Sequence, residues 1–181
     1  IILNLLEKTE LPIEGILLFS PMLELKRDYK GRKNKLISNV GKISKDTRFK
    51  VGITPQDLTR NDEIIEETAN DGLMLKKVTY SWYNLINEKM KETMDHIRDI
   101  KPISALIMYG TNDKILETQS INEMKDKLKS KEMYFKVWDG LYHEIHNEPE
   151  RDLVMRYVLS FLNNSVNTMG FIVNEEEIED I

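Results

Sequence analysis

Hydrophobic residues along the chain occur in two patterns, and each pattern predicts one kind of secondary structure. Short, continuous apolar runs bounded by turn residues are typical of strands that are buried on both faces of a parallel sheet. Residues 13–23 and 103–109 have this pattern, and residues 133–138 form a further strand-like run with alternate apolar residues. The long segments between these runs favour an α/β fold with a mainly parallel sheet.

Four other segments repeat apolar residues at spacings of three and four, which predicts helices with one face toward a core. They are residues 1–8, 78–97, 117–130 and 150–162. In the longest of them the predicted inward stripe consists of Trp82, Leu85, Ile86, Met90, Met94 and Ile97. His96 lies near the end of this helix, where a protonated imidazole suits the helix dipole, so we expect a structural role for it.

Residues 25–77 interrupt the alternation of strands and helices. This segment is basic in its first half, weakly periodic, and contains glycines at positions 31, 41 and 52. Pro55 is suited to the first turn of a short helix, and the acidic residues 61–68 predict a second one. We therefore expect an inserted subdomain of short helices and loops that contains no sheet.

The composition excludes several kinds of site. The chain has no cysteine, which rules out disulfides, thiolate metal sites and a cysteine nucleophile, and its three histidines leave little room for zinc. We expect neither a metal nor another cofactor. The net charge of −5 argues against nucleic acid as the main partner. No apolar run approaches the roughly 18 residues that a membrane-spanning helix needs.

The charge is unevenly distributed along the chain. Residues 25–50 contain ten Lys or Arg side chains and two acids, whereas acids predominate in residues 61–71 and 175–180. A basic segment of this kind can attract phosphates or anionic lipid head groups, which would allow peripheral membrane contact. An ordinary solvated surface explains the same composition.

Two polar turns follow predicted strands, and each turn carries a residue suited to acid–base chemistry. Asp113 follows residues 103–109, and His143 follows residues 133–138. Sites in open α/β sheets lie just beyond the carboxyl ends of the strands, where a carboxylate can orient a histidine that accepts a proton from a hydroxyl. From the spacing alone, an ordinary turn and an unrelated loop histidine are an equally good interpretation.

The order of acid and then histidine is that of α/β-hydrolases, whose nucleophilic serine precedes both in a G-x-S-x-G turn. No G-x-S-x-G occurs in the 181 residues. Ser20 lies at the end of a predicted strand but lacks the flanking glycines, so we do not expect it to be the nucleophile. We expect the nucleophile immediately before Ile1, with residues 1–8 as the far part of the helix that follows it.

The chain resembles the monoacylglycerol lipase and lysophospholipase branch of the α/β-hydrolases, which is related to the serine aminopeptidase group. The resemblance covers about residues 1–163 and rests on residues 102–113 (PISALIMYGTND), 140–151 (GLYHEIHNEPER) and 58–67 (LTRNDEIIEE). It implies that Asp113 is the acid and His143 the base of a catalytic triad. It also implies that residues 25–77 form a cap over an acyl pocket.

Two further positions are candidates for substrate binding. By the same resemblance, His146 would line the alcohol (glycerol) side of the pocket. Ile115 and Leu116, just past the acid, are candidates for contact with the acyl chain. Each position also has a plainer explanation, since His146 could be a surface residue that caps a helix starting at Glu148, and Ile115 and Leu116 could be core residues.

We therefore predict the C-terminal part of an α/β-hydrolase fold, a mainly parallel sheet with flanking helices and an inserted helical cap. Residues 1–24 and 78–163 would form the core, residues 25–77 the cap, and residues 164–181 an acidic tail. The expected function is that of a serine ester hydrolase acting on monoacylglycerol- or lysophospholipid-like esters. An N-terminal part of the same protein would supply the nucleophile and the oxyanion hole, and without it we expect the polypeptide to be inactive and poorly folded.

Two other interpretations remain open. An aminopeptidase, or a hydrolase with a different nucleophile, would keep the fold and change the bond that is cleaved. A non-catalytic binding module would keep the fold and lack the nucleophile. We expect a cytoplasmic location, although the residues that would carry a targeting signal are not among those printed.

Overall fold

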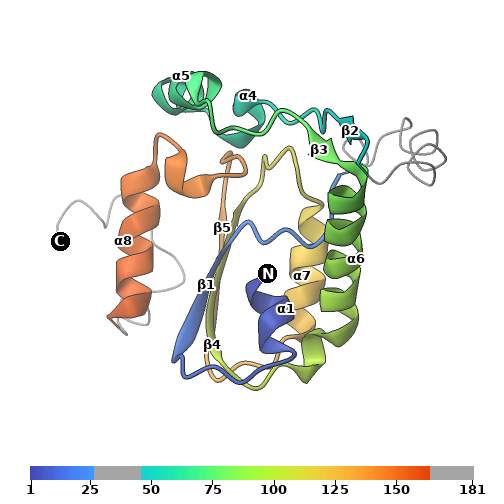
Figure 1. The fold of residues 1–181 in the computed structure, drawn as a ribbon. Helices are drawn as coiled ribbons and strands as arrows, with labels where there is room; N and C mark the ends of the chain where they lie inside the picture. Colours follow the sequence, from blue (N-terminus) through green and yellow to red (C-terminus); the bar gives the residue numbers. More distant parts are fainter. Residues whose placement is uncertain (27–45, 164–181) are drawn as a thin grey trace.

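The computed structural model describes residues 1–26 and 46–163, in which helices lie on both sides of a parallel sheet (Figure 1). The strands are β1 (Gly15–Phe19), β4 (Ser104–Gly110) and β5 (Met133–Trp138), in the spatial order β1-β4-β5. Both neighbouring pairs run parallel, with Gly15 opposite Ser104 in the first pair. The predicted α/β fold with a mainly parallel sheet is confirmed, and each strand lies in the segment expected for it.

The central strand β4 is buried on both faces because helices cover both sides of the sheet. On one side lie α1 (Ile2–Leu6), α6 (Tyr80–His96) and α7 (Thr118–Lys127), and on the other lies α8 (Arg151–Leu162) (Figure 1). Ala105, Ile107 and Tyr109 belong to the hydrophobic cluster on the α6 side, whereas Leu106 and Met108 pack with residues of α8. This alternation explains why the sequence of β4 is a continuous apolar run.

Helix α6 begins two residues later than predicted and buries most, but not all, of the predicted stripe. Thr79 is its N-cap, and the Thr79 hydroxyl accepts a hydrogen bond from the Trp82 amide at 3.2 Å. Tyr83 and Met90 face the core, but the side chains of Trp82 and Leu85 are 47% and 50% exposed. The prediction that Trp82 and Leu85 face inward is therefore wrong, because the buried stripe starts at Tyr83. The rest of the predicted stripe is confirmed, since Met90 and Ile97 are core residues and Ile86 and Met94 pack against the core.

The end of α6 carries His96. Its Nδ1 lies 2.9 Å from Oδ2 of Asp99 in the short 3₁₀ helix η1 (Ile97–Asp99), and both side chains are exposed. The hydrogen bond and the negative charge of Asp99 raise the pKa of His96. This arrangement agrees with a structural role for His96 at the helix end.

Short elements fill the segment between β1 and α6. They are β2 (Arg48–Phe49), α4 (Pro55–Leu58), α5 (Asp62–Asn70) and β3 (Val78–Thr79). Both helices were expected, and they lie above the carboxyl edge of the sheet (Figure 1). β2 and β3 pair antiparallel, so the prediction of no sheet within residues 25–77 is wrong for Arg48–Phe49. The edge-on contact between the rings of Phe49 and Tyr83, at 5.4 Å, anchors this small ladder to α6.

Much of the expected cap and tail falls on residues that the structure does not describe. Residues 27–45, which hold most of the basic stretch, and residues 164–181 are outside the described part. Leu25, the first residue of the predicted cap, is buried in the core and forms an antiparallel bridge with Leu116. The division into core and cap stays a prediction. No helix among the described residues has the length and apolar character to cross a membrane.

Candidate active site

The turn after β4 buries Asp113. The Asp113 amide donates to the carbonyl of Gly110, the last residue of the strand, at 3.2 Å. The side chain is fully buried, and its Oδ1 accepts hydrogen bonds from the Ile115 and Leu116 amides at 2.8 and 3.0 Å. Lys26 donates to the main-chain carbonyl of Asp113. The turn therefore fixes one carboxylate oxygen and directs the other, Oδ2, toward a second group.

The loop after β5 brings His143 to the same edge of the sheet. Its backbone lies directly against the end of β4, where the Asn112 amide donates to the Leu141 carbonyl at 3.0 Å. Gly110 permits this approach, because a Cβ placed there would lie 2.1 Å from the Leu141 carbonyl oxygen. Any side chain at this position would push the two turns apart.

Asp113 and His143 form a hydrogen-bonded pair. Nδ1 of His143 lies 2.8 Å from Oδ2 of Asp113. An ionised carboxylate only accepts hydrogen bonds, so the Nδ1–H of His143 is the donor, and Nε2 of the neutral ring is then the proton acceptor. The His143 side chain is 21% exposed, so the ring is not sealed in the interior.

The surroundings of Asp113 keep its carboxyl ionised. Burial alone raises the pKa of this carboxyl, but the hydrogen bond and charge of His143 and the Leu116 and Ile115 amides lower it. The net effect is a pKa below the ordinary value. An ionised Asp113 can stabilise the imidazolium that forms when His143 takes up a proton at Nε2.

The two candidate substrate-binding residues differ in exposure. His146 lies in the 3₁₀ helix η2 (Ile145–Asn147), is exposed, and has its ring centroid 5.9 Å from that of Phe19 at the end of β1. The interpretation of His146 as a helix cap is wrong, because α8 begins at Arg151 and has Glu150 as its N-cap. Ile115 is only 2% exposed and belongs to the core cluster, as does Leu116. Contact of these residues with a substrate stays a prediction.

Ser20 follows β1 in a left-handed backbone conformation, with a φ of +42°. Its amide donates to the Met108 carbonyl at 2.8 Å. Its hydroxyl is buried and has no hydrogen-bond partner among the residues that the structure describes. A serine nucleophile needs a base within hydrogen-bond reach, so this geometry agrees with setting Ser20 aside.

Two residues that shape the site were not predicted from the sequence. Gly110 ends β4, and a glycine at a strand end is a known signal for close backbone approach, so it was recognisable in principle. Lys26 carries no local signal, because its contact with Asp113 joins segments that are far apart in the sequence.

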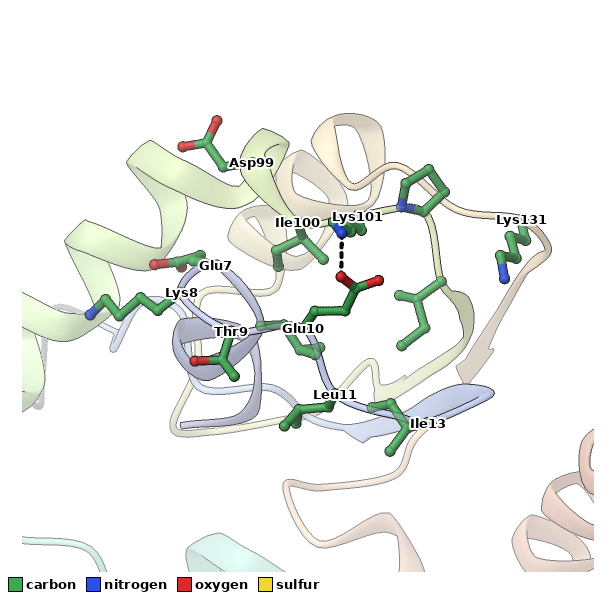
Figure 2. Close-up of a pocket in the computed structure, with 13 residues that line it drawn as sticks. Glu7, Lys8, Thr9, Glu10, Leu11, Ile13, Asp99, Ile100, Lys101 and Lys131 are labelled. Carbon is green, nitrogen blue, oxygen red and sulfur yellow. Dashed lines mark hydrogen bonds and ion pairs between the residues drawn. The ribbon is translucent and has the colours of Figure 1, made fainter.

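A cleft of about 380 Å³ lies at the opposite edge of the sheet (Figure 2). Its lining residues precede the three strands, and Lys101 forms an ion pair with Glu10 there. The cleft is therefore separate from Asp113 and His143, which follow β4 and β5. In the described part of the chain, no group of three His, Cys, Asp or Glu side chains converges as metal ligands.

Residues 1–150 match the family described as serine aminopeptidase, S33. The chain belongs to this family. The match confirms the resemblance to α/β-hydrolases that residues 102–113 and 140–151 carry. Phospholipase YtpA of Bacillus subtilis (strain 168) is 27% identical over 154 residues, which are 85% of this chain and 60% of that protein. A monoacylglycerol lipase of Mycolicibacterium smegmatis is 35% identical over 57 residues, 32% of this chain and 20% of that protein.

Solved structures of two lipases share the fold of this S33 chain. The monoacylglycerol lipase of Paleococcus ferrophilus matches with a TM-score of 0.79 at 20% identity, over 91% of this chain and 64% of that one. A soluble variant of the monoglyceride lipase of Saccharomyces cerevisiae matches with a TM-score of 0.77 at 16% identity, over 90% and 57%. The chain thus spans about 60% of the length of these relatives.

Proposed function

We propose that the chain supplies the acid–base pair of a serine ester hydrolase, with His143 as the base and Asp113 as the residue that orients it. The observation that supports this most directly is the 2.8 Å hydrogen bond between His143 Nδ1 and Asp113 Oδ2. It joins two turns at the carboxyl edge of a parallel sheet, which is where α/β enzymes place their sites.

The proposed reaction is acyl transfer in two steps. A serine hydroxyl attacks the ester carbonyl while His143 Nε2 takes its proton, and the imidazolium then protonates the leaving alcohol. In the second step His143 takes a proton from the water that attacks the acyl-enzyme and returns it to the serine oxygen as the acyl–serine bond breaks and the acid leaves. No G-x-S-x-G occurs in the 181 residues. We propose that an N-terminal part of the same protein supplies the serine and the oxyanion donors.

We propose monoacylglycerol- or lysophospholipid-like esters as substrates. Two relatives are named as a phospholipase and a monoacylglycerol lipase, which supports this class. His146, exposed beside Phe19, is the candidate for contact with the alcohol part, whereas the burial of Ile115 favours its role in the core. Residues 25–77 would cover the acyl chain, and their basic part could approach an anionic membrane surface.

A second candidate is cleavage of a peptide bond, which the family description as serine aminopeptidase favours. The same acid–base pair would serve either reaction, because both proceed through an acyl-enzyme. Parallel assays with monoacylglycerols and with aminoacyl p-nitroanilides separate the two. A binding module without catalysis would give no turnover with either substrate and no labelling by a fluorophosphonate.

The replacement His143→Ala in the whole protein tests the proposal. We expect ester turnover to fall by about four orders of magnitude or more, because the serine loses its base. Labelling by a fluorophosphonate should be lost in parallel. The matched control is His96→Ala, which removes an exposed histidine that contacts Asp99, and it should leave turnover unchanged. Turnover at the parent rate in His143→Ala would contradict the proposal.

A further inference from the structure

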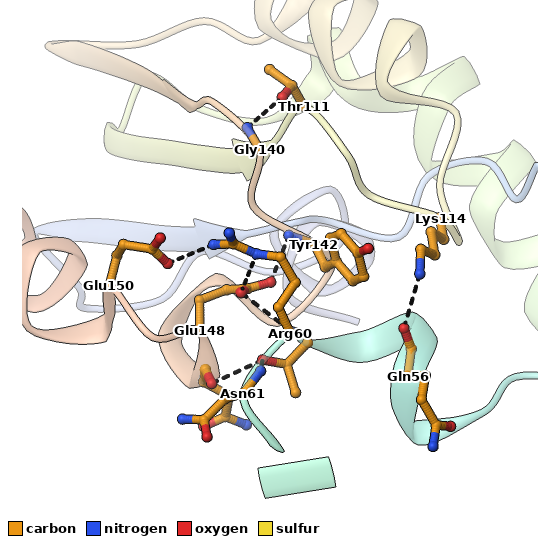
Figure 3. A network of polar contacts seen from close by, with 11 residues as sticks. Gln56, Arg60, Asn61, Thr111, Lys114, Gly140, Tyr142, Glu148 and Glu150 are labelled. Atoms are coloured by element: carbon orange, nitrogen blue, oxygen red, sulfur yellow. Dashed lines mark hydrogen bonds and ion pairs between the residues drawn. The ribbon is translucent and has the colours of Figure 1, made fainter. Parts of the chain in front are cut away.

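A buried carboxylate, that of Glu148, contacts both Arg60 and the backbone of Tyr142, the residue before His143 (Figure 3). The Glu148 side chain is fully buried, and its Oε1 accepts a hydrogen bond from the Tyr142 amide at 2.7 Å. Its Oε2 accepts from the Arg60 amide at 3.3 Å and from Arg60 Nε at 2.9 Å. A buried charge is stable only where it is paired and hydrogen-bonded. Both partners are therefore needed to keep Glu148 in this place.

These contacts restrain the backbone on both sides of His143. Before it, the Tyr142 amide is bound by Glu148. After it, the Glu144 amide donates to the Leu58 carbonyl at 2.8 Å. Both restraints lead to the end of α4 and the segment that follows it, one directly through Leu58 and the other through the Glu148–Arg60 pair.

The same segment makes a third contact with this loop. The buried Thr59 hydroxyl donates to the Asn147 carbonyl at 2.9 Å and accepts from the Asn61 amide at 3.1 Å. Arg60 also pairs with Glu150 through Nη2 at 2.6 Å, but the Glu150 side chain is 42% exposed (Figure 3). Among the two acids that contact Arg60, only Glu148 also binds the amide next to His143.

We propose that Glu148, clamped by Arg60, is a positioning residue for His143. The proposal rests on the function proposed above, since it concerns the direction in which the base points. Asp113 binds only Nδ1, and a ring bound at one nitrogen can still tilt about that hydrogen bond. The fixed amides of Tyr142 and Glu144 prevent this tilt by holding the backbone of His143, so that Nε2 stays directed at the hydroxyl whose proton it accepts. A displacement of about 1 Å at such a site can lower the rate about 100-fold.

The decisive experiment compares Glu148→Ala, Glu148→Gln and Glu150→Gln in the whole protein, with active sites titrated by a fluorophosphonate. Glu148→Ala removes the acceptor for the Tyr142 amide, so we expect kcat per titrated site to fall about 100-fold, with KM within about threefold of the parent. Glu148→Gln keeps one accepting oxygen and should recover at least about tenfold of that loss. Glu150→Gln alters only the exposed contact of Arg60 and should keep the parent kcat.

A merely structural role would give a different result. It would lower the melting temperature and the fraction of titratable sites, but kcat per titrated site would stay at the parent value, and this outcome overturns the proposal. If Glu148→Ala does not fold, Arg60→Ala takes its place, because the Arg60 side chain is 34% exposed. We expect a loss of at least about tenfold in kcat per site there, and the parent value would overturn the proposal.

His143→Ala in the same protein separates the two proposals. Full turnover in His143→Ala means that the proposed function itself is wrong. Loss of turnover in His143→Ala, together with the parent kcat in Glu148→Ala, means that only the positioning role is wrong.

Discussion

The replacement Asp113→Asn probes the proposed site at its most buried group. The parent carboxylate accepts three hydrogen bonds, from the Ile115 and Leu116 amides on Oδ1 and from His143 Nδ1 on Oδ2. An asparagine of nearly the same size has one accepting oxygen and one donating NH₂ group. Either the NH₂ group faces His143, or it faces the two amides.

The first arrangement should dominate because it satisfies every group. The oxygen keeps both amides, and the imidazole moves its proton to Nε2 so that Nδ1 can accept from the NH₂ group. The second arrangement would leave buried donors unpaired, at a cost of about 1–3 kcal/mol for each. In the first arrangement His143 can no longer accept a proton at Nε2. The corresponding change in a Ser-His-Asp triad lowers kcat about 10⁴-fold, which is about 5.4 kcal/mol in the barrier.

The assay is kcat of the whole protein on a monoacylglycerol, together with the free energy of unfolding in denaturant. We expect a loss of about 10⁴-fold in kcat, while stability at pH 7 falls by no more than about 1–3 kcal/mol. The pair of measurements separates loss of the base from loss of the fold. A variant that keeps more than about a tenth of the parent kcat would refute the assignment of Asp113 and His143 as a working pair.

Four further predictions follow, two from other contacts, one from the sequence and one from the pKa of Asp113. Gly110→Ala should lower kcat about 100-fold and destabilise the fold by about 1–3 kcal/mol, because the added Cβ meets the Leu141 carbonyl; a parent-like rate and melting temperature would contradict this. Hydrogen bonds from Lys8 and Lys89 hold the pKa of Glu92 at about 2. Lys8→Ala should therefore raise the pKa of Glu92 toward its ordinary value in an NMR titration, and an unchanged pKa would show that Lys8 does not lower it. Residues 1–181 produced alone should not hydrolyse p-nitrophenyl esters, and measurable hydrolysis would mean that a nucleophile lies among them. The lowered pKa of Asp113 stabilises the fold above the ordinary carboxyl pKa of about 3.9, and this contribution is lost as the pH falls through the pKa that Asp113 has in the folded state. The free energies of unfolding of the parent and of Asp113→Asn should therefore converge below about pH 4. A difference that stays constant with pH would exclude this linkage.

The parts of the fold that could be predicted from the sequence are those that local patterns determine. β4 is apolar at nearly every position because both of its faces are covered, and that pattern is visible without a structure. The prediction for α6 was wrong at Trp82 and Leu85, because two stripes that share Ile86 and Met90 compete in the same helix, one through Trp82 and one through Tyr83. Contact between Tyr83 and Phe49 accompanies burial of the second stripe, and no local pattern reports this contact.

The candidate site also has a part that local sequence patterns predict and a part that depends on distant contacts. Asp113 and His143 could be paired from the sequence, since parallel strands end at a common edge and each residue follows its own strand. Glu148 lies within residues 140–151, which carry the family resemblance. Its burial and its proposed role nevertheless depend on Arg60, which is 88 residues away. The sequence pattern around Glu148 is that of a polar turn, which gives no reason to expect a buried charge.

The pairing of β1 with β4 has a consequence for how the chain can vary. Gly15 lies opposite Ser104, so the sheet closes a loop that contains α4, α5 and the whole of α6. The entropy lost on closing a flexible loop grows only with the logarithm of its length, by about 0.6 kcal/mol for each doubling. Insertions or deletions in the loops between these strands, outside α6 and the paired β2 and β3, should therefore cost the core little. At Leu58, Thr59 and Arg60, by contrast, a change in length would displace the backbone that holds the His143 loop.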